Sequence, residues 1–379
     1  MIVGVARESF PGERRVALVP EGVRRLIANK IEVAVASGAG QAVWFSDDDY
    51  VRAGARLQPY PEKLLAEADL VVKINPPTLL EVEALRQGAA LVCLLYPRAH
   101  VEATLRLAAR GVTTLALENL PRTTVAQSMD VLSSQSSAAG YRAVIVAANL
   151  LAKFFPMLMT AAGTFAPARV LVLGAGVAGL QAIATARRLG AVVEAFDVRR
   201  TVREQVESLG AKYIEPWLEQ AAESAEGYAQ QLTEVSLERA RNAIRLPLAN
   251  ADVCITTALV PQQRAPILIT RQMFEGMRPG SVLVDLAAAQ GGNCELTKAG
   301  EDLVWGGVTI VGRLNLAAEV AQDASRMFSR NMEKFLAHIL RDGLLRLDFD
   351  DEITRRCVVT HDGEVLGAEL RQALASLKG

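Results

Sequence analysis

Three glycines in a short turn, followed by a single carboxylate, have the spacing that points most directly to chemistry. Gly174, Gly176 and Gly179 form a G-x-G-x-x-G pattern between an apolar run and a helical pattern. The first glycine permits the tight bend, the second lets a pyrophosphate approach the backbone, and the third lets the helix lie close to the strand. Asp197 ends the next apolar run, where a carboxylate accepts hydrogen bonds from a ribose 2′-hydroxyl. The stretch predicts a dinucleotide site; a glycine-rich turn that serves packing alone is the alternative.

The charge at the end of that second apolar run bears on which dinucleotide is bound. The carboxylate of Asp197 would repel a 2′-phosphate, which favours NAD over NADP. Arg199 and Arg200 follow at once, and either guanidinium could instead attract a phosphate. The pattern favours NAD, with this alternative left open.

A second polar stretch, residues 118–137, lies before the glycine turn and is dense in hydroxyl groups. It has two interpretations. It is a loop that faces a nucleotide, or it is a solvated linker in which Ser128 or Asp130 caps the following helix. The side chains concerned are Arg122, Gln127, Asp130 and Ser133.

Apolar runs alternate with helical patterns on both sides of this polar stretch, which predicts parallel βαβ units and two α/β domains. In the first domain we expect strands at 2–6, 31–36, 69–74, 90–95 and 112–117, with helices at 61–68, 79–87 and 100–110. In the second we expect strands at 170–173, 212–214, 252–257, 281–286 and 308–312, with a mostly polar, helical segment at 216–246.

The C-terminal part is too short to bury a core of its own. Residues 316–345 have a long amphipathic helical pattern, and 346–379 are a short, strand-like polar tail. We expect both to pack on the first domain. The predicted fold class is α/β, with two Rossmann-like domains, parallel sheets and a cleft between them. The first domain is discontinuous in sequence, comprising 1–130 and 320–379, and the second comprises 131–319.

Composition excludes several classes of function. The chain has 379 residues, with 41 basic and 42 acidic side chains, and this balance gives no electrostatic case for nucleic-acid binding. Four scattered cysteines and three histidines show no metal-ligand spacing, so no metal is expected. With no signal peptide recognised, the cysteines are expected to be reduced thiols of a cytoplasmic protein. The most apolar region, 143–168, is interrupted by prolines and predicts a buried helix joining the domains rather than a membrane span.

Over essentially its whole length the chain resembles the NAD(H)-binding component, domain I, of proton-translocating NAD(P) transhydrogenase, in the form in which the alpha subunit is split between genes. The motifs that carry the resemblance are PRTTVAQSMDVLSSQSSAAGYRAV, ARVLVLGAGVAGLQAIATARRLGA, ITTALVP and GSVLVDLAAAQGGNCEL. The first is the most specific, because few families place an R-x-x-x-x-Q-x-x-D loop before a Rossmann unit.

The resemblance implies roles for particular residues. Arg122, Gln127, Asp130 and Ser133 would hold the nicotinamide end, where the transfer takes place. Gly227 and Tyr228 match a mobile loop that closes over the nucleotide, although a surface helix with a break is an equally good interpretation of that stretch. The remaining expected contacts with NAD(H) are Gly174, Gly176, Val177, Gly179, Asp197, Val198, Arg199, Ala258 and Leu259.

The resemblance also implies partners. A hydride would pass directly from NADH on this chain to NADP⁺ on a partner, a Re/Si-specific reaction coupled to proton translocation. The expected assembly is a homodimer, peripheral on the cytoplasmic face of the membrane. An NADP(H)-binding beta subunit and membrane-spanning subunits complete it.

Alanine dehydrogenase has similar motifs and is the main alternative. Arg15 matches a substrate-carboxylate ligand of that family, and Lys73 lies in a similar segment. Its catalytic histidine would fall at Tyr96, however, and its active-site aspartate at Ala289. Dehydrogenation of an amino acid needs a base, whereas transfer between two nicotinamide rings needs only close approach and alignment. A non-catalytic NAD-binding module is the third possibility.

Overall fold

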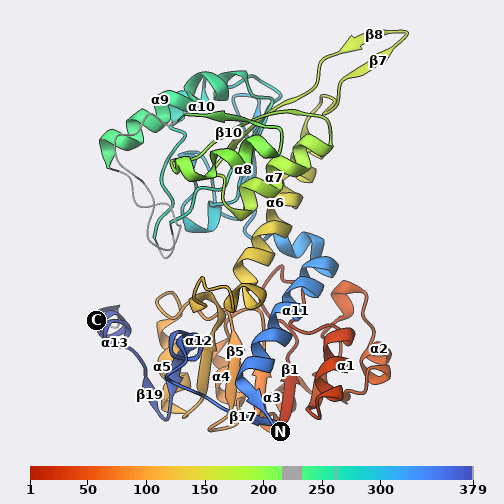
Figure 1. Cartoon of the computed structure of the whole chain (residues 1–379), viewed down its shortest axis with the longest axis vertical. Coiled ribbons are helices and arrows are strands. Elements are labelled where there is room, and N and C mark those ends of the chain that lie inside the picture. The colour runs from red at the N-terminus through yellow and green to blue at the C-terminus, as the bar shows by residue number, and fades with distance from the viewer. Residues whose placement is uncertain (216–232, 261–262, 378–379) are drawn as a thin grey trace. The chain divides into compact units, whose positions relative to one another are not determined.

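The computed structural model describes residues 1–215, 233–260 and 263–377, which form two compact units. Unit 1 comprises Met1–Gln135 and Ala318–Gly379, and unit 2 comprises Ser136–Ala317 (Figure 1). Each unit is built on its own mostly parallel sheet, so the prediction of two Rossmann-like α/β domains is confirmed. The units are described separately below.

The sheet of unit 1 has the strand order β19-β18-β6-β5-β4-β1-β2-β3. Its six N-terminal strands are parallel, with β1 at the centre between β2 and β4, which is the doubly wound order. The C-terminal segment extends this sheet, because β18 pairs antiparallel with β6. The strands are β1 (Ile2–Val5), β2 (Glu32–Ala36), β3 (Arg56–Gln58), β4 (Leu70–Val72), β5 (Ala90–Cys93), β6 (Thr113–Ala116), β18 (Val358–His361) and β19 (Glu364–Val365).

The helices of unit 1 have clear local start signals. Ser46 with Asp49, and Thr78 with Glu81, form capping boxes at α2 and α4, while a proline begins each of α1 and α3. The helices are α1 (Pro20–Ala28), α2 (Asp47–Arg52), α3 (Pro61–Glu67), α4 (Leu79–Ala84), α5 (Val101–Ala109), α11 (Ala321–Ile339), α12 (Glu352–Cys357) and α13 (Ala368–Leu377).

The long helix α11 belongs to unit 1 because one of its faces completes the core there. Phe328, Met332 and Phe335 on this face are fully buried. The hydroxyls of Ser325 and Ser329 accept hydrogen bonds from the backbone of the segment that leads into α1. The tail after α11 is more structured than the strand-like segment predicted, since it forms α12, β18, β19 and α13.

The sheet of unit 2 has the order β11-β10-β9-β12-β13-β15-β14, with only β14 antiparallel. The order reverses between β9 and β12, so ligand-binding loops are expected at the carboxyl ends of these strands. The strands are β9 (Arg169–Leu173), β10 (Val192–Phe196), β11 (Lys212–Ile214), β12 (Val253–Thr256), β13 (Val282–Asp285), β14 (Asp302–Trp305) and β15 (Val308–Val311). The helices are α7 (Val177–Arg188), α8 (Arg203–Ser208), α9 (Glu234–Asn250) and α10 (Arg271–Phe274).

Helix α6 (Val131–Leu150) contributes most of its length to unit 2, where it lies very close to α7. A Cβ atom at Gly140 would come 2.1 Å from the carbonyl oxygen of Ala178, so only glycine allows this approach. The buried side chains of Ala143 and Ala147 continue the same contact surface.

The prediction that residues 143–168 form one buried helix is wrong. The helix ends at Leu150, and β7 (Leu158–Thr160) pairs with β8 (Gly163–Phe165) in an antiparallel hairpin that projects from unit 2 (Figure 1). Pro156 cannot continue a helical hydrogen-bond ladder, which accounts for the break. The apolar side chains of the hairpin are exposed, Met159 by 77% and Phe165 by 42%. No helix in the part of the chain that the structure describes is long and apolar enough to cross a bilayer.

Candidate nucleotide-binding site

The glycine turn lies between the central strand β9 and helix α7. Gly174 has φ +100°, and a Cβ atom there would come 2.6 Å from Oγ1 of Thr257. A Cβ atom at Gly179 would come 1.8 Å from the carbonyl oxygen of Gly174. At Gly176, by contrast, a Cβ atom would meet nothing within 4 Å. The fold therefore requires glycine at the first and third positions, whereas the second leaves open space where a phosphate can approach the backbone.

Helix α7 begins directly at this open space. It has no side-chain cap, so its N-terminal N–H groups and the positive end of its dipole remain available to an anion. Val177, the first residue of the helix, is 39% exposed. This arrangement can bind a pyrophosphate without any basic side chain.

Asp197 lies at the carboxyl end of β10, as predicted, but its carboxylate is already occupied. It accepts four hydrogen bonds, one from the backbone N–H of Ala175 and three from Arg199. The distances from Arg199 are 2.8 Å for its backbone N, 3.0 Å for Nε and 2.9 Å for Nη2. A carboxylate has about four acceptor positions, so this one is saturated. A ribose hydroxyl can bind Asp197 only if the guanidinium of Arg199 moves away.

The loop after β12 is adjacent to the glycine turn. Oγ1 of Thr257 donates to the carbonyl oxygen of Gly174 over 3.0 Å, and Leu259 is 37% exposed beside the uncapped helix end. The peptide groups of Ala258 are hydrogen-bonded to Asn293, a residue after β13. Sequence reasoning did not identify Thr257 or Asn293, because their contacts join loops that are distant in the chain.

The remaining predicted residues before the glycine turn lie in unit 1, within or beside a 3-10 turn, Ala126–Met129. Asp130 caps α6, since its carboxylate accepts from the backbone N of Ser133 at 2.9 Å and from Oγ of Ser133 at 2.5 Å. Asp130, rather than Ser128, is thus the capping residue. Arg122 and Gln127 are exposed on the same loop. Gly227 and Tyr228 lie outside the described residues.

The residues expected to bind substrate in an amino-acid dehydrogenase form a buried polar cluster in unit 1. Nη2 of Arg15 lies 2.6 Å from Glu13 and Nη1 lies 2.7 Å from Oε1 of Gln135, while Nζ of Lys73 lies 2.6 Å from Glu81. Burial opposes ionisation of Glu13, but its hydrogen bonds with Arg15 prevail and lower its pKa to about 2.

Tyr96 occupies the position at which that reaction would need its histidine. The residue has φ +48°. Burial of the phenol, and then the charge of Glu118, raise its pKa above the usual value of 10. It therefore stays protonated at neutral pH and cannot act as a general base. Ala289, at the position of the expected aspartate, carries no ionisable group.

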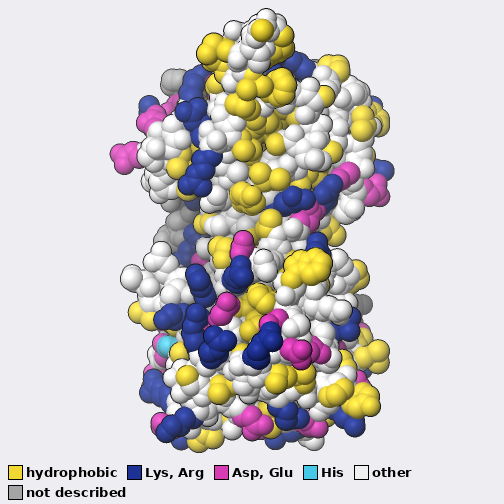
Figure 2. All heavy atoms as spheres, turned by 90° about the vertical axis from the view of Figure 1, so that its right-hand side faces the viewer, with side chains coloured by type: hydrophobic (Ala, Val, Ile, Leu, Met, Phe, Trp, Pro, Cys, Tyr) yellow, Lys and Arg dark blue, Asp and Glu magenta, His cyan; other side chains and the backbone are white. Residues whose placement is uncertain are grey.

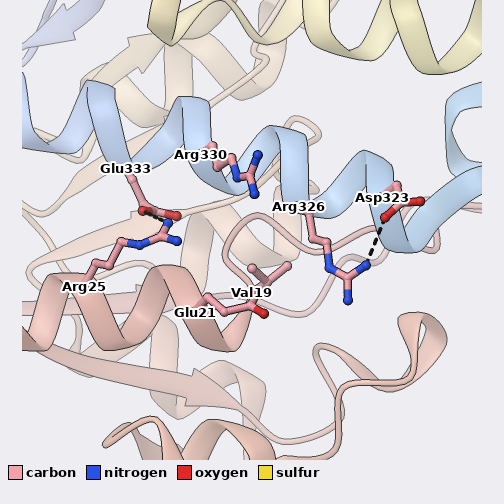
Figure 3. Close-up of a pocket in the computed structure, with 7 residues that line it drawn as sticks. All are labelled: Val19, Glu21, Arg25, Asp323, Arg326, Arg330 and Glu333. Carbon is pink, nitrogen blue, oxygen red and sulfur yellow. Dashed lines mark hydrogen bonds and ion pairs between the residues drawn. The ribbon is translucent and has the colours of Figure 1, made fainter.

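A surface cavity of about 430 Å³ lies elsewhere in unit 1, between α1 and α11 (Figure 3). Ion pairs cross it, with Arg25 2.7 Å from Glu333 and Arg326 3.0 Å from Asp323. Its lining residues are Val19, Glu21, Arg25, Asp323, Arg326, Arg330 and Glu333, none of them a predicted nucleotide contact. The positive and negative charges balance, which gives no preference for a charged ligand.

Comparison with known proteins settles the family. The N-terminal domain model of alanine dehydrogenase/PNT matches residues 4–139, and the C-terminal domain model matches residues 143–368. The chain belongs to this family. It is 45% identical to the first part of the NAD(P) transhydrogenase subunit alpha of Rhodospirillum rubrum, over 97% of this chain and 98% of that protein.

Solved structures match both branches of the alanine dehydrogenase/PNT family. A transhydrogenase from Sinorhizobium meliloti superposes with a TM-score of 0.86 at 42% identity, covering 97% of this chain and all of that one. An L-alanine dehydrogenase superposes with a TM-score of 0.83 at 26% identity, covering all of both chains. The backbone is thus shared by the two branches, and the transhydrogenase relatives are closer in sequence, as the motifs predicted.

Proposed function

We propose that this chain is the NAD(H)-binding component of a proton-translocating NAD(P) transhydrogenase. NAD(H) is its cofactor, and NADP(H) binds to a partner subunit. The observation that carries the proposal is the combination of full-length similarity to an alpha subunit with an uncapped helix N-terminus that opens onto Gly176. In the complete enzyme a hydride passes from NADH to NADP⁺, and proton translocation is coupled to that transfer.

The residues of this chain bind and orient the nucleotide. The first turn of α7, with Gly176 and Val177, takes the phosphates, and Asp197 takes the adenosine ribose after Arg199 has moved. Val198 packs beside the ribose, and Ala258 and Leu259 form the facing wall. Arg122, Gln127, Asp130 and Ser133 hold the nicotinamide end, and Gly227 with Tyr228 close over the nucleotide. The bound cofactor supplies the hydride, so the protein contributes alignment and exclusion of water.

The side chains at the two diagnostic positions support transhydrogenation over amino-acid oxidation. Tyr96 stays protonated at neutral pH and Ala289 cannot take up a proton. An amino acid losing a hydride must also lose a proton to a base. Hydride transfer between nicotinamides has no such requirement.

We also propose that the chain works as a homodimer at the cytoplasmic face of the membrane, with separate NADP(H)-binding and membrane-spanning subunits. The relative that matches it end to end is named as one portion of an alpha subunit, which implies further portions. Support for the dimer comes from the exposed apolar hairpin. Figure 2, which views the molecule from the side on which the hairpin projects in Figure 1, shows hydrophobic side chains gathered over unit 2.

The deciding experiment is NADH-dependent reduction of an NADP analogue by the purified chain, alone and after addition to membranes stripped of peripheral proteins. The proposal requires little activity alone and strong activity with membranes. Absence of activity in both cases, together with NAD⁺ reduction by alanine with the chain alone, would establish the alanine dehydrogenase alternative. NADH binding without either activity would leave a non-catalytic nucleotide-binding module.

A further inference from the structure

Asn293 is a fully buried polar residue that joins three segments of unit 2. Its side-chain Oδ1 accepts from the backbone N of Ala258 at 3.0 Å, and its Nδ2 donates to the carbonyl oxygens of Ala258 and Pro266 at 2.8 and 2.9 Å. Its own carbonyl oxygen accepts from the backbone N–H groups of Leu268 and Ile269. Every polar group of this side chain is therefore directed at the backbone of the segment that follows β12.

Asp285 holds Asn293 in place from the end of β13. Its Oδ2 accepts from the backbone N of Asn293 at 2.8 Å and from Oγ1 of Thr297 at 2.7 Å. Its Oδ1 accepts from Oγ1 of Thr256 at 2.8 Å and from the backbone N of Ala287 at 3.0 Å. Asp285 is itself fully buried, so these bonds lie in a low-dielectric interior where an unmade bond is costly.

The same loop is joined to the glycine turn on its other side. Thr257 donates its hydroxyl hydrogen to the carbonyl oxygen of Gly174, and its backbone N–H donates to Leu173. The loops after β9, β12 and β13 thus form one continuous hydrogen-bonded rim, running from Gly174 through Thr257 and Ala258 to Asn293 and Asp285. The chemistry expected at this rim is binding of the nucleotide that faces the glycine turn.

We infer that Asn293, anchored by Asp285, is a positioning residue that fixes the loop carrying Ala258 and Leu259 against the bound NAD(H). Because both the N–H and the carbonyl oxygen of Ala258 are bonded to Asn293, Ala258 contacts the nucleotide by van der Waals packing and not by hydrogen bonds. The inference rests on the proposed function, since it assumes that NAD(H) occupies this rim.

The chain offers a matched control at the opposite edge of the same sheet. Asp252, at the start of β12, is also buried, and its Oδ2 accepts from the backbone N of Arg169 at 2.8 Å and from Nζ of Lys153 at 2.7 Å. Asp252→Asn removes a buried charge that holds backbone in unit 2, but at the end of the strands away from the glycine turn.

The experiment compares NADH binding, followed by nucleotide fluorescence, with thermal unfolding for the whole chain. Asn293→Ala is expected to raise the NADH dissociation constant about tenfold, the effect of a loop that has lost its register. Asp252→Asn is expected to lower the unfolding temperature with the dissociation constant unchanged. Thr297→Val, which removes one donor to Asp285 and keeps the side-chain shape, is the milder variant in case Asn293→Ala does not fold, and should raise the constant about threefold.

The outcomes separate the inference from the proposed function. Lower unfolding temperatures for Asn293→Ala and Thr297→Val with NADH affinity equal to wild type would overturn the positioning role. So would an equal loss of affinity in Asp252→Asn, because the effect would then follow stability and not place. Failure of the wild-type chain itself to bind NADH would overturn the proposed function instead.

Discussion

The guanidinium of Arg199 covers the carboxylate of Asp197, with Nε 3.0 Å from Oδ1 and Nη2 2.9 Å from Oδ2. The two residues are separated by one position in the chain, so the contact is local and needs no long-range ordering. Asp197 is only 5% exposed, and the fourth donor, the N–H of Ala175, belongs to the glycine turn. The acidic side chain that selects the ribose is thus held closed until a nucleotide displaces Arg199.

Asp197→Ala is expected to weaken NADH binding by about 1–2 kcal/mol, the strength of one or two charge-assisted hydrogen bonds. Isothermal titration of NADH into the purified chain measures the change. Unchanged affinity would show that this carboxylate does not bind the ribose.

Arg199→Ala is the companion variant, and it should behave in the opposite way. Removing the guanidinium frees both carboxylate oxygens while the N–H of Ala175 still holds Asp197 in place. NADH affinity is therefore expected to stay within about threefold of wild type or to improve. A loss as large as that of Asp197→Ala would mean that the pair acts as one rigid unit and that Arg199 stays in place when NADH binds.

The glycines of the turn are expected to separate folding from binding. Gly176→Ala places a methyl group in open space, at a backbone φ of −76° that any residue adopts, so its thermal stability should match wild type. Its NADH affinity should fall at least about tenfold, because the methyl group stands where a phosphate approaches.

Gly179→Ala should instead prevent folding or destabilise the chain by about 3 kcal/mol, since its Cβ would come 1.8 Å from a backbone oxygen. Circular dichroism melts and NADH titrations of both variants make the comparison. A stable Gly176→Ala that binds NADH normally would contradict the placement of the phosphates.

The fold was largely predictable from sequence, because it depends on local patterns. Apolar runs such as 170–173 are buried strands, and glycine and capping residues mark the helix ends. The hairpin at β7 and β8 was missed because Pro156 and two three-residue strands leave a weak local signal inside an apolar region.

The candidate site was predictable in its residue types but not in its contacts. Asp197 could be recognised from its place after a strand, whereas its pairing with Arg199 depends on side-chain geometry. The role of Asn293 depends on a contact with Ala258, in a loop after a different strand. No period or motif in a single sequence encodes such a contact.

Gln127→Asn is expected to impair hydride transfer more than NADH binding. The backbone N of Gln127 bonds to the carbonyl oxygen of Thr123 at 3.1 Å, so the loop keeps its shape when the side chain is shortened. Misplacing the nicotinamide by about 1 Å costs on the order of 100-fold in rate, while the NADH dissociation constant should change less than about threefold. Stopped-flow transfer in the complete enzyme and NADH titration of the isolated chain give the two values.

Ser128→Ala is the control for this loop. The carbonyl oxygen of Ser128, rather than its side chain, accepts the hydrogen bond from Asn331. The control should leave both the transfer rate and NADH affinity unchanged. Equal losses of rate and affinity in Gln127→Asn would remove the distinction between orienting the ring and binding the nucleotide.

Met159→Lys should disrupt the proposed homodimer. The side chain is 77% exposed at the hairpin, and burying a lysine in an apolar interface leaves a desolvated charge. The dimer dissociation constant should rise about tenfold or more by analytical ultracentrifugation. Leu80→Lys introduces the same charge at an 84% exposed leucine on α4 of unit 1 and should leave the dimer intact. Dimers of equal strength in both variants would exclude the hairpin from the interface.

The carboxyl group of Glu118 makes the stability of unit 1 depend on pH. Burial raises its pKa to about 7, although it accepts hydrogen bonds from the backbone N–H groups of Tyr96 and Leu95. In the unfolded chain the pKa returns to about 4.3. Between these values the folded protein binds more protons than the unfolded chain, so the free energy of unfolding falls as the pH rises. The contribution is complete below about pH 4 and is lost above about pH 7.

Glu118→Gln removes this titration and leaves every other group in place. Urea unfolding of both proteins at pH 5 and pH 8 isolates the effect, because the remaining ionisable groups cancel in the difference. Wild type should lose stability relative to Glu118→Gln as the pH rises from 5 to 8, since the desolvated carboxylate is costly once ionised. The opposite trend would show that the two backbone N–H donors outweigh burial and that Glu118 is ionised in the folded protein throughout this range.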